Sequence, residues 1–519
     1  MQYGSVEGTV QRPEQLHNVY VAFCFIASGG LLFGYIIGIN SNILLPGQLL
    51  CPTDGSVQEG SWTSIGYAQC YTLGPFQIGL LSSLNLIGAC VSSLICFKYA
   101  DDLGRKLEVQ IAAALYFTGA IMAGAGPCLW IIYVGFLVYG LGIGFAMHAG
   151  PLYIAEIAPA SVRGALISAK EFVIVIGIFL GFLIGYAFSG IDTVGWRWMV
   201  VLSGGVGLTM GVGMNFIPES PRYLAFQSIR DKSEGPDLIK QASEAMKFFS
   251  PGDSFQVEKE LENILTETEA SMGMGIVSWT DSFNYPLPLI IGCGLVFLQQ
   301  ITGQPSVLYF ATNIFRSAGF GESAALSSVG LGLVKLLATV FCVQFVDKYG
   351  RRFLLFIGIG MMAISLAVIG SAFLFRECSV PGALSECPLD MVTLPKSWAG
   401  LTVFSLALYV SGYQVGFGPI NWLIISEIFP LRVRGAAISV ATMVNFASNL
   451  MMTLTSPVLN DAMGPSKVFF SYFFFAVLSL AFVYHMVPET KGKTLEEIEQ
   501  MMKSGPSTTP LESARVGGI

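Results

Sequence analysis

The chain has 519 residues, of which 53% are hydrophobic and only 12% are charged, and its mean hydropathy is +0.65. Soluble domains carry about twice that fraction of charged residues, so the composition excludes an ordinary soluble protein. The hydrophobic residues fall in separate runs of about 20, the length of a helix that crosses a bilayer, whereas a membrane β-barrel would show short alternating segments. We therefore predict an all-α, multi-pass integral membrane protein.

Twelve apolar runs follow one another along the chain and predict twelve transmembrane helices. They lie at 19–45, 75–99, 107–127, 129–153, 164–189, 196–217, 286–315, 323–346, 353–376, 398–426, 436–459 and 466–487. Because their number is even, both termini should lie on the same side of the membrane.

The distribution of Lys and Arg predicts which side that is. Twenty of the 27 Lys and Arg residues fall in the termini and the segments on their side, and five fall in the segments on the other side. The remaining two, Lys170 and Lys335, lie inside apolar runs. Cytoplasmic loops are the ones enriched in these cations. Both termini are therefore expected in the cytoplasm, in a plasma, vacuolar or plastid envelope membrane.

The loops on the opposite side carry two pairs of cysteines. Cys51 and Cys70 share the first of these loops, and Cys378 and Cys387 share a later one. Disulfides form and persist on the non-cytoplasmic side of a membrane. Two bridges and four free thiols both stay open as alternatives at this point.

Three motifs occur twice in the same order. DDLGRK at 101–106 recurs as DKYGRR at 347–352, EIAPASVRGA at 156–165 as EIFPLRVRGA at 427–436, and PES at 218–220 as PET at 488–490. Such a duplication predicts two equivalent six-helix bundles. The expected organisation is a tail at 1–18, an N-terminal bundle at 19–217, a linker at 218–285, a C-terminal bundle at 286–487 and a tail at 488–519.

The linker and the C-terminal tail are polar, and each contains a segment that favours a helix. Residues 258–270 (EKELENILTETEA) favour a helix, so we expect short cytoplasmic helices packed beneath the bundles. The tail opens at Thr494 with the capping box TLEE, which predicts one further helix.

The duplicated motifs place cations and carboxylates together on the cytoplasmic side. Positive-inside anchoring explains the cations but not the carboxylates that recur beside them. We expect these groups to pair in one state and separate in another, as a cytoplasmic gate in which each pair contributes about 1 kcal/mol at most. The gate residues are Asp101, Arg105, Lys106, Glu156, Arg163, Glu219, Arg222, Asp347, Arg351, Arg352, Glu427, Arg434 and Glu489.

The stretch from Gln299 to Phe310 (QQITGQPSVLYF) is out of place in the middle of an apolar run. A buried amide costs free energy unless it is hydrogen-bonded, and Pro305 cannot donate to the helix ladder. A weakened, polar helix at membrane depth is tolerated where it faces protein or a water-filled cavity. This stretch therefore predicts the substrate site of a transporter, in preference to a kinked helix whose glutamines only hold its neighbours.

These motifs together resemble the sugar porter family of the major facilitator superfamily, from about residue 20 to 500. IPESPR at 217–222, FGPINW at 417–422 and VPETKGKTLEEIE at 487–499 complete the set. AMHAGPLYIAE at 146–156, RGALISAKEF at 163–172 and GQPSVLY at 303–309 are most similar to the plant vacuolar glucose and D-xylose-proton-symporter-like branch. The resemblance implies alternating access around one central sugar site.

The resemblance also implies a set of sugar-binding residues. Gln299 and Gln300 match the paired glutamines, Trp422 matches a tryptophan that packs on the sugar, Asn445 matches a sugar-binding asparagine, and Gln414 lies at a position often acidic or amide. Amides both donate to and accept from hydroxyls, and an indole stacks on the apolar face of a sugar. Gln304 replaces an amide that relatives carry where this chain has Pro305.

Two neutral ligands of the family are replaced here by charges. Lys335 aligns with an asparagine and Glu171 with a glutamine, and each charge costs about 2.5–3.5 kcal/mol near the bilayer centre. We expect an interaction between the two across the halves that couples sugar occupancy, and a proton, to rocking. The alternative is two separate charges that line a wet cavity.

Coupling to protons stays open in the sequence. The family's acidic residue after the FGY motif is absent, because Ile36 follows Tyr35, and this favours facilitated uniport over proton symport. His148 is a further coupling candidate because histidine titrates near neutral pH. Its structural alternative is a local hydrogen bond to the carbonyl freed by Pro151.

The predicted function is transport of a monosaccharide, a hexose such as glucose or the pentose xylose. Partners are the sugar, protons if coupled, and the lipid bilayer, with no nucleic acid. We find no phosphate-binding loop, metal cluster or nucleophile constellation, so neither an enzyme nor a cofactor is expected. The alternatives are a polyol or inositol transporter and a transporter-like sugar sensor.

Overall fold

The computed structural model describes residues 16–52, 59–60, 66–67, 69–231, 235–249, 254–273, 279–378, 392–430, 433–493 and 495–504. Within these ranges, twelve helical spans are long and apolar enough to cross a membrane, which confirms the predicted number. The N-terminal half consists of α1 (His17–Ile43), α2 (Pro75–Leu103), α3 (Arg105–Ala125), α4 (Leu129–Ile157), α5 (Ala160–Phe188) and α6 (Gly195–Asn215). The C-terminal half consists of α10 (Pro286–Ile301), α11 (Gln304–Tyr309), α12 (Ala311–Phe315), α13 (Ala324–Tyr349), α14 (Arg351–Ala372), α15 (Lys396–Gly416), α16 (Gly418–Ile428), α17 (Arg434–Met463) and α18 (Pro465–Met486).

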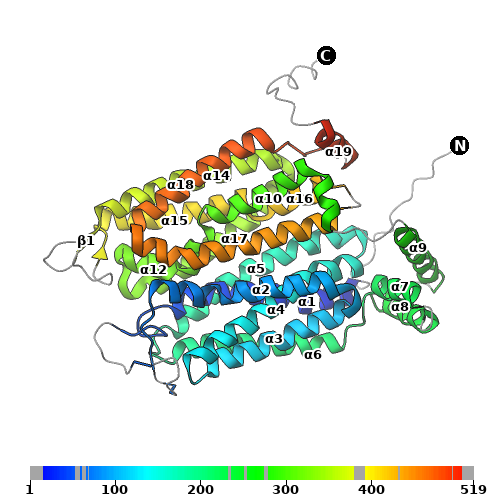
Figure 1. The fold of residues 1–519 in the computed structure, drawn as a ribbon, viewed down its shortest axis with the longest axis horizontal. Coiled ribbons are helices and arrows are strands. Elements are labelled where there is room, and N and C mark those ends of the chain that lie inside the picture. The colour runs from blue at the N-terminus through cyan, green and yellow to red at the C-terminus, as the bar shows by residue number, and fades with distance from the viewer. Residues whose placement is uncertain are drawn as a thin grey trace, which may run out of the picture.

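The duplicated sequence folds into two bundles that lie side by side (Figure 1). In the N-terminal half α3 packs against α4 and α6, and in the C-terminal half α14 packs against α15 and α18. The two halves meet along two seams, where α2 packs against α17 and α5 packs against α13. Between these seams α1 of the N-terminal half also contacts α11 and α12 of the C-terminal half.

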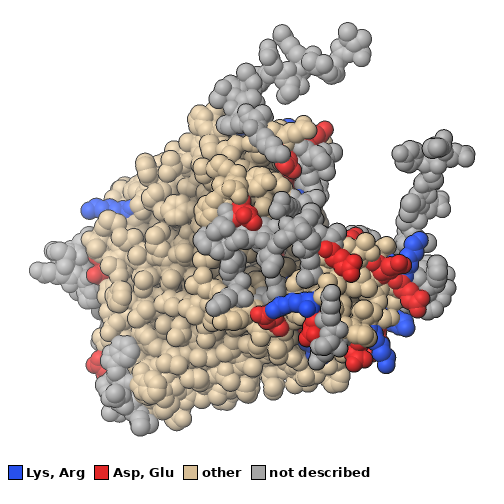
Figure 2. Space-filling view, turned by 45° about the vertical axis from the view of Figure 1, so that its right-hand side comes forward, with Lys and Arg blue, Asp and Glu red and all other residues tan. Residues whose placement is uncertain are grey.

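One end of the molecule carries the linker helices α7 (Pro221–Arg230), α8 (Gly235–Phe249) and α9 (Ser254–Gly273), and we refer to it as the linker end. The predicted helix at 258–270 lies within α9. These helices share a small apolar core of their own, which includes Leu224, Met246 and Leu261. The helix α19 (Leu495–Ser504) lies at the same end of the C-terminal half, and charged side chains gather there (Figures 1 and 2).

The opposite end carries a disulfide and a short β-hairpin, and we refer to it as the disulfide end. Strands β1 (Glu377–Cys378) and β2 (Val392–Thr393) pair there as antiparallel neighbours. Cys51 and Cys70 form a disulfide between α1 and α2. The second predicted pair cannot be placed, because Cys387 and the side chain of Cys378 lie outside the described residues.

The Cys51–Cys70 bridge closes a loop with a sequence separation of 19. A loop of this length contributes about 3 kcal/mol by restricting the unfolded chain. We expect Cys51→Ser to lower the melting temperature of the purified protein by several degrees. Cys90→Ser removes a free thiol in α2 and should leave the melting temperature nearly unchanged. Equal melting temperatures for the two variants would show that the bridge adds no stability.

Two of the predicted spans are broken rather than continuous. The run predicted at 286–315 divides into α10, α11 and α12, and the run at 398–426 divides into α15 and α16. Between α10 and α11, Gly303 has φ of +96°, and a Cβ there would lie 2.4 Å from the ring of Tyr472. Only glycine fits this turn. Pro305 then lies in the first turn of α11, where its missing N–H costs no helical hydrogen bond.

Candidate functional site

Gln299, at the end of α10, is held by protein groups at both ends of its amide. Its Nε2 donates to the hydroxyl of Tyr413 at 2.6 Å, and its Oε1 accepts from Nδ2 of Asn421 at 3.1 Å. The side chain is buried, with 5% of its surface exposed. In this conformation Gln299 therefore positions α15 and α16 around the helix break, and its amide is already occupied.

Gln300 differs from its neighbour because part of its amide has no protein partner. Its Nε2 donates to Oδ1 of Asn445, which lies on α17 and is only partly buried. Its Oε1 is buried and makes no hydrogen bond with any described residue. A buried acceptor without a donor costs about 1–3 kcal/mol. The site thus presents an amide oxygen that a hydroxyl group would satisfy.

Lys335 of α13 joins the same polar cluster. Its Nζ donates to Oε1 of Gln414 at 2.7 Å and lies 4.8 Å from the centroid of the Tyr413 ring. Since Tyr413 also receives the hydrogen bond from Gln299, the two predicted residues are connected through a tyrosine. The side chain of Lys335 is 3% exposed, so its ammonium depends on these two partners.

Glu171 of α5 lies opposite this cluster in the N-terminal half. Although both side chains are described, Glu171 and Lys335 do not form a direct ion pair, and Lys335 donates to Gln414 instead. The helices that carry them, α5 and α13, pack against each other. The predicted interaction between Glu171 and Lys335 is therefore not among the described contacts, and a role for this pair in coupling stays a prediction.

Two other predicted ligands border the helix breaks. Gln304 begins α11, and Trp422 lies on α16, just after the break at Phe417. Both side chains are partly buried. The sequence interpretation did not include Tyr413 or Asn421, which hold Gln299 in place. A signal for each was present, because Tyr413 directly precedes Gln414 and Asn421 belongs to the FGPINW motif.

Hydrogen bonds join the two halves at the disulfide end, and the sequence interpretation missed them as well. Oγ of Ser41 lies 3.0 Å from Oγ1 of Thr312, which also donates to Asn42. Nδ2 of Asn40 donates to the carbonyl of Tyr309 at 3.4 Å. These contacts connect α1 directly to α11 and α12. The run Asn40-Ser41-Asn42 was their signal, since three consecutive polar residues lie within the apolar run predicted at 19–45.

At the linker end the duplicated motifs build the same turn twice. Gly104 and Gly350 have φ of +85° and +93°, and a Cβ at either would lie 2.8 Å from a carboxylate oxygen of Glu219 or Glu489. Glu219 accepts from the backbone N–H of Lys106 at 3.0 Å, and Glu489 accepts from that of Arg351 at 3.0 Å. Each carboxylate thus caps the start of a helix.

Burial raises the pKa of Glu219, against the opposing effect of the N–H groups of Ser220 and Lys106. The charge on this cap is therefore costly to maintain, and the two backbone donors are what stabilise it.

Two ion pairs that the structure describes beside these turns each lie within one half. Arg105 and Glu156 are 3.1 Å apart, and Arg351 and Glu427 are 3.0 Å apart. These two pairs therefore do not join the halves to each other, and the state-dependent pairing of the cytoplasmic gate stays a prediction. Arg163 and Arg434 instead donate to the carbonyls of Ala158 and Phe429, at the ends of α4 and α16.

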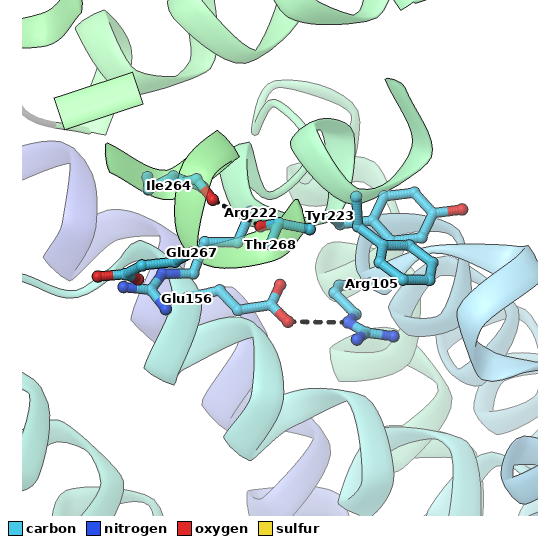
Figure 3. Close-up of a pocket in the computed structure, with 8 residues that line it drawn as sticks. Arg105, Glu156, Arg222, Tyr223, Ile264, Glu267 and Thr268 are labelled. Carbon is cyan, nitrogen blue, oxygen red and sulfur yellow. Dashed lines mark hydrogen bonds and ion pairs between the residues drawn. The ribbon is translucent and has the colours of Figure 1, made fainter. Parts of the chain in front are cut away.

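A cavity of about 500 Å³ lies over the first of these pairs (Figure 3). It is lined by Arg105, Glu156, Arg222, Tyr223, Phe226, Ile264, Glu267 and Thr268. The N-terminal half and the linker helices α7 and α9 enclose it, so it is separate from the cluster around Gln300. The side chains of Asp101 and Asp347 lie outside the described residues.

His148 contacts a carboxylate that the sequence interpretation overlooked. Its Nδ1 lies 2.7 Å from Oε1 of Glu108, in the first turn of α3. The contact described for His148 is therefore with Glu108, and not the expected hydrogen bond to the backbone carbonyl that Pro151 frees. Glu108 was missed because it directly follows Leu107, the first residue of an apolar run.

Comparison with known proteins agrees with this architecture. The profile of the family described as "Sugar (and other) transporter" matches residues 21–502. The chain is 39% identical to D-xylose-proton symporter-like 2 of Arabidopsis thaliana over 92% of its length and 89% of the relative. It is 32% identical to the glucose transporter GlcP of Staphylococcus epidermidis over 94% of its length and 98% of that protein.

Solved structures show the same arrangement of helices. The inward open conformation of the xylose transporter XylE from E. coli superposes with a TM-score of 0.70 at 25% identity, covering 93% of this chain and 99% of that one. Membership of one family therefore explains the two-bundle fold, the broken helices and the set of motifs. The chain belongs to the sugar transporter family and has its twelve-helix major facilitator fold.

Proposed function

We propose that this protein carries a monosaccharide, xylose or glucose, through a site at the break between α10 and α11. The observation that carries the proposal is the buried Oε1 of Gln300, which has no donor among the described residues. A sugar hydroxyl that donates to this oxygen would remove the penalty of about 1–3 kcal/mol. The names of the relatives, a D-xylose-proton symporter-like protein and a glucose transporter, support the same substrate class.

Uptake into proteoliposomes tests this proposal. We expect saturable uptake of labelled xylose or glucose that the other sugar inhibits and that inositol inhibits weakly. Uptake of inositol in preference to both sugars would instead make the protein a polyol transporter. Absence of flux for every sugar and polyol would contradict transport and favour the sensor.

The linker end is proposed to face the cytoplasm, because most of the Lys and Arg residues lie there or in the termini. In that orientation the conformation described here is inward-facing. Contacts such as Ser41–Thr312 close the disulfide end, while the pairs Arg105–Glu156 and Arg351–Glu427 stay within their halves. The likeness to an inward open transporter supports this assignment. The cytoplasmic gate would then form its cross-half pairs in the outward-facing state.

Proton coupling is proposed to act through Glu171. Glu171 directly follows Lys170 on α5, and α5 packs against α13, which carries Lys335, so gain of a proton at Glu171 would change the balance of charge between these two helices. The relative named as proton symporter-like supports coupling, although Ile36 occupies the position of the family's usual acid. His148 contacts Glu108 rather than Glu171.

Glu171→Gln tests this role, because glutamine keeps the shape of the side chain and cannot ionise. We expect the variant to transport sugar but to lose most of the stimulation that a pH gradient gives to the wild type. Glu322→Gln, which changes an exposed carboxylate at the disulfide end, should keep the stimulation. Unchanged pH dependence in Glu171→Gln would exclude a proton role for this residue.

A further inference from the structure

Three side chains of metal-binding type meet in the N-terminal half, outside the cluster around Gln300. Cys96 comes from α2, Glu108 from α3 and His148 from α4. One ligand atom from each lies within 4.8 Å of the others. Cys96 and Glu108 are fully buried, while the His148 side chain is 25% exposed. Cys96 and Glu108 thus form the buried part of the cluster, and His148 is its most exposed member.

The carboxylate of Glu108 is only half satisfied. Its Oε1 lies 2.7 Å from Nδ1 of His148, and the Cys96 thiol lies close to the same carboxylate, but its Oε2 is buried and receives no hydrogen bond from an N–H or O–H group of any described residue. A buried carboxylate requires a compensating charge or hydrogen bonds on both oxygens. The group that completes this cluster should therefore be a cation small enough to reach Oε2.

We propose that Cys96, Glu108 and His148 bind a divalent transition-metal ion of the Zn²⁺ type. A thiolate, an imidazole and a carboxylate are the donors that this ion prefers, and three protein ligands leave the fourth tetrahedral position for water. A hard cation such as Mg²⁺ or Ca²⁺ would require oxygen ligands throughout. The ligand atoms would move by on the order of 1 Å to reach metal–ligand distances of about 2.0–2.3 Å.

The position of the site indicates what the ion would do. Glu108 lies one turn beyond Gly104, and Glu156, the partner of Arg105, follows His148 on α4. A metal ion would therefore join α2, α3 and α4 beside the turn that Glu219 caps. Because all three ligands belong to one half, the ion would brace that half and leave the surface between the halves free to move.

Cobalt titration of the purified full-length chain tests the proposal. Co²⁺ replaces Zn²⁺ in such sites, and its thiolate complexes absorb in the near ultraviolet. We expect one Co²⁺ per chain, a thiolate-to-cobalt band, and loss of that band when Zn²⁺ is added. Cys96→Ser should remove the band, and His148→Ala should weaken Co²⁺ binding at least tenfold. The protein should carry no polyhistidine tag.

Matched variants make the result specific. Cys90→Ser changes another free thiol of α2, and His485→Ala changes a histidine at the end of α18, so both should keep the band. Cys96→Ser alters one atom, and its elution and melting profiles show whether it folds. The proposal would be overturned if the wild type showed no thiolate-to-cobalt band, or if the band survived in Cys96→Ser. Absence of the band from the wild type would mean that the cluster holds only the Glu108–His148 hydrogen bond and no metal ion. No sugar is used, so failure of the sugar-transport proposal would not affect this test.

Discussion

Replacement of Gln300 by alanine should lower sugar uptake at subsaturating sugar by about tenfold to a hundredfold. The change removes the buried Oε1 that awaits a hydroxyl, and it also leaves Oδ1 of Asn445 without its donor. Each lost or unsatisfied hydrogen bond costs about 1–3 kcal/mol, and every 1.4 kcal/mol is a factor of about ten. Initial rates of labelled uptake into proteoliposomes measure the effect.

Gln110→Ala is the matched control, because Gln110 is a glutamine of α3 whose amide hydrogen-bonds Asn215 at the exposed surface. It should transport like the wild type. Gln299→Ala should also lower uptake, through loss of the contacts to Tyr413 and Asn421 that position the site. Wild-type uptake by Gln300→Ala, in liposomes with equal amounts of protein, would remove Gln300 from the sugar site.

A disulfide between cysteines placed at positions 41 and 312 should stop transport almost completely. The side-chain oxygens of Ser41 and Thr312 are 3.0 Å apart, and they belong to opposite halves. Alternating access requires these halves to separate at the disulfide end. Oxidation of Ser41→Cys/Thr312→Cys should therefore hold the protein inward-facing, and mild reduction should restore uptake.

A control pair within one half separates this effect from damage by the oxidant. The hydroxyl oxygen of Thr312 also lies 2.8 Å from that of Ser328, and both residues belong to the C-terminal half. After oxidation the Thr312→Cys/Ser328→Cys variant should therefore still transport sugar. Its native Cys51–Cys70 bridge is exposed to the same oxidant and reductant, so the control covers their effect on that bridge too. If the cross-half pair becomes covalently linked and uptake continues, the contact is not one that opens during transport.

The sequence predicts the helices because their signal is local. Runs of about 20 apolar residues determine the spans, and the repeated motifs determine the two halves. The breaks have local signals too. Gly303 and Pro305 mark the one between α10 and α11, and Gly418 and Pro419 mark the one at Phe417 in the same way, although the sequence analysis predicted a continuous span there.

Partners of the site residues were harder to predict than the residues themselves. Gln299 and Gln300 are adjacent and identical in chemistry, yet one amide is fully occupied and the other is not. That difference depends on Tyr413 and Asn421, more than one hundred residues away. For the same reason the sequence left open whether Lys335 interacts with Glu171, whereas in the folded chain Lys335 donates a hydrogen bond to Gln414.

Glu108 shows the reverse problem, in which a residue has no local sign of importance. It follows directly on Leu107 at the start of an apolar run, where a glutamate favours the beginning of a helix whatever else it does. Only the packing of α2, α3 and α4 brings Cys96 and His148 to it. Sequence distance thus conceals a cluster whose three members come from three helices.

An experimental structure of the protein with xylose or glucose bound would test the central claim most directly. We predict a sugar hydroxyl within hydrogen-bond distance of Oε1 of Gln300, with Asn445 and Trp422 also in contact with the sugar. In that structure Nε2 of Gln299 should still donate to Tyr413. A sugar bound elsewhere, with Oε1 of Gln300 paired to a protein group, would contradict the site proposed for this transporter.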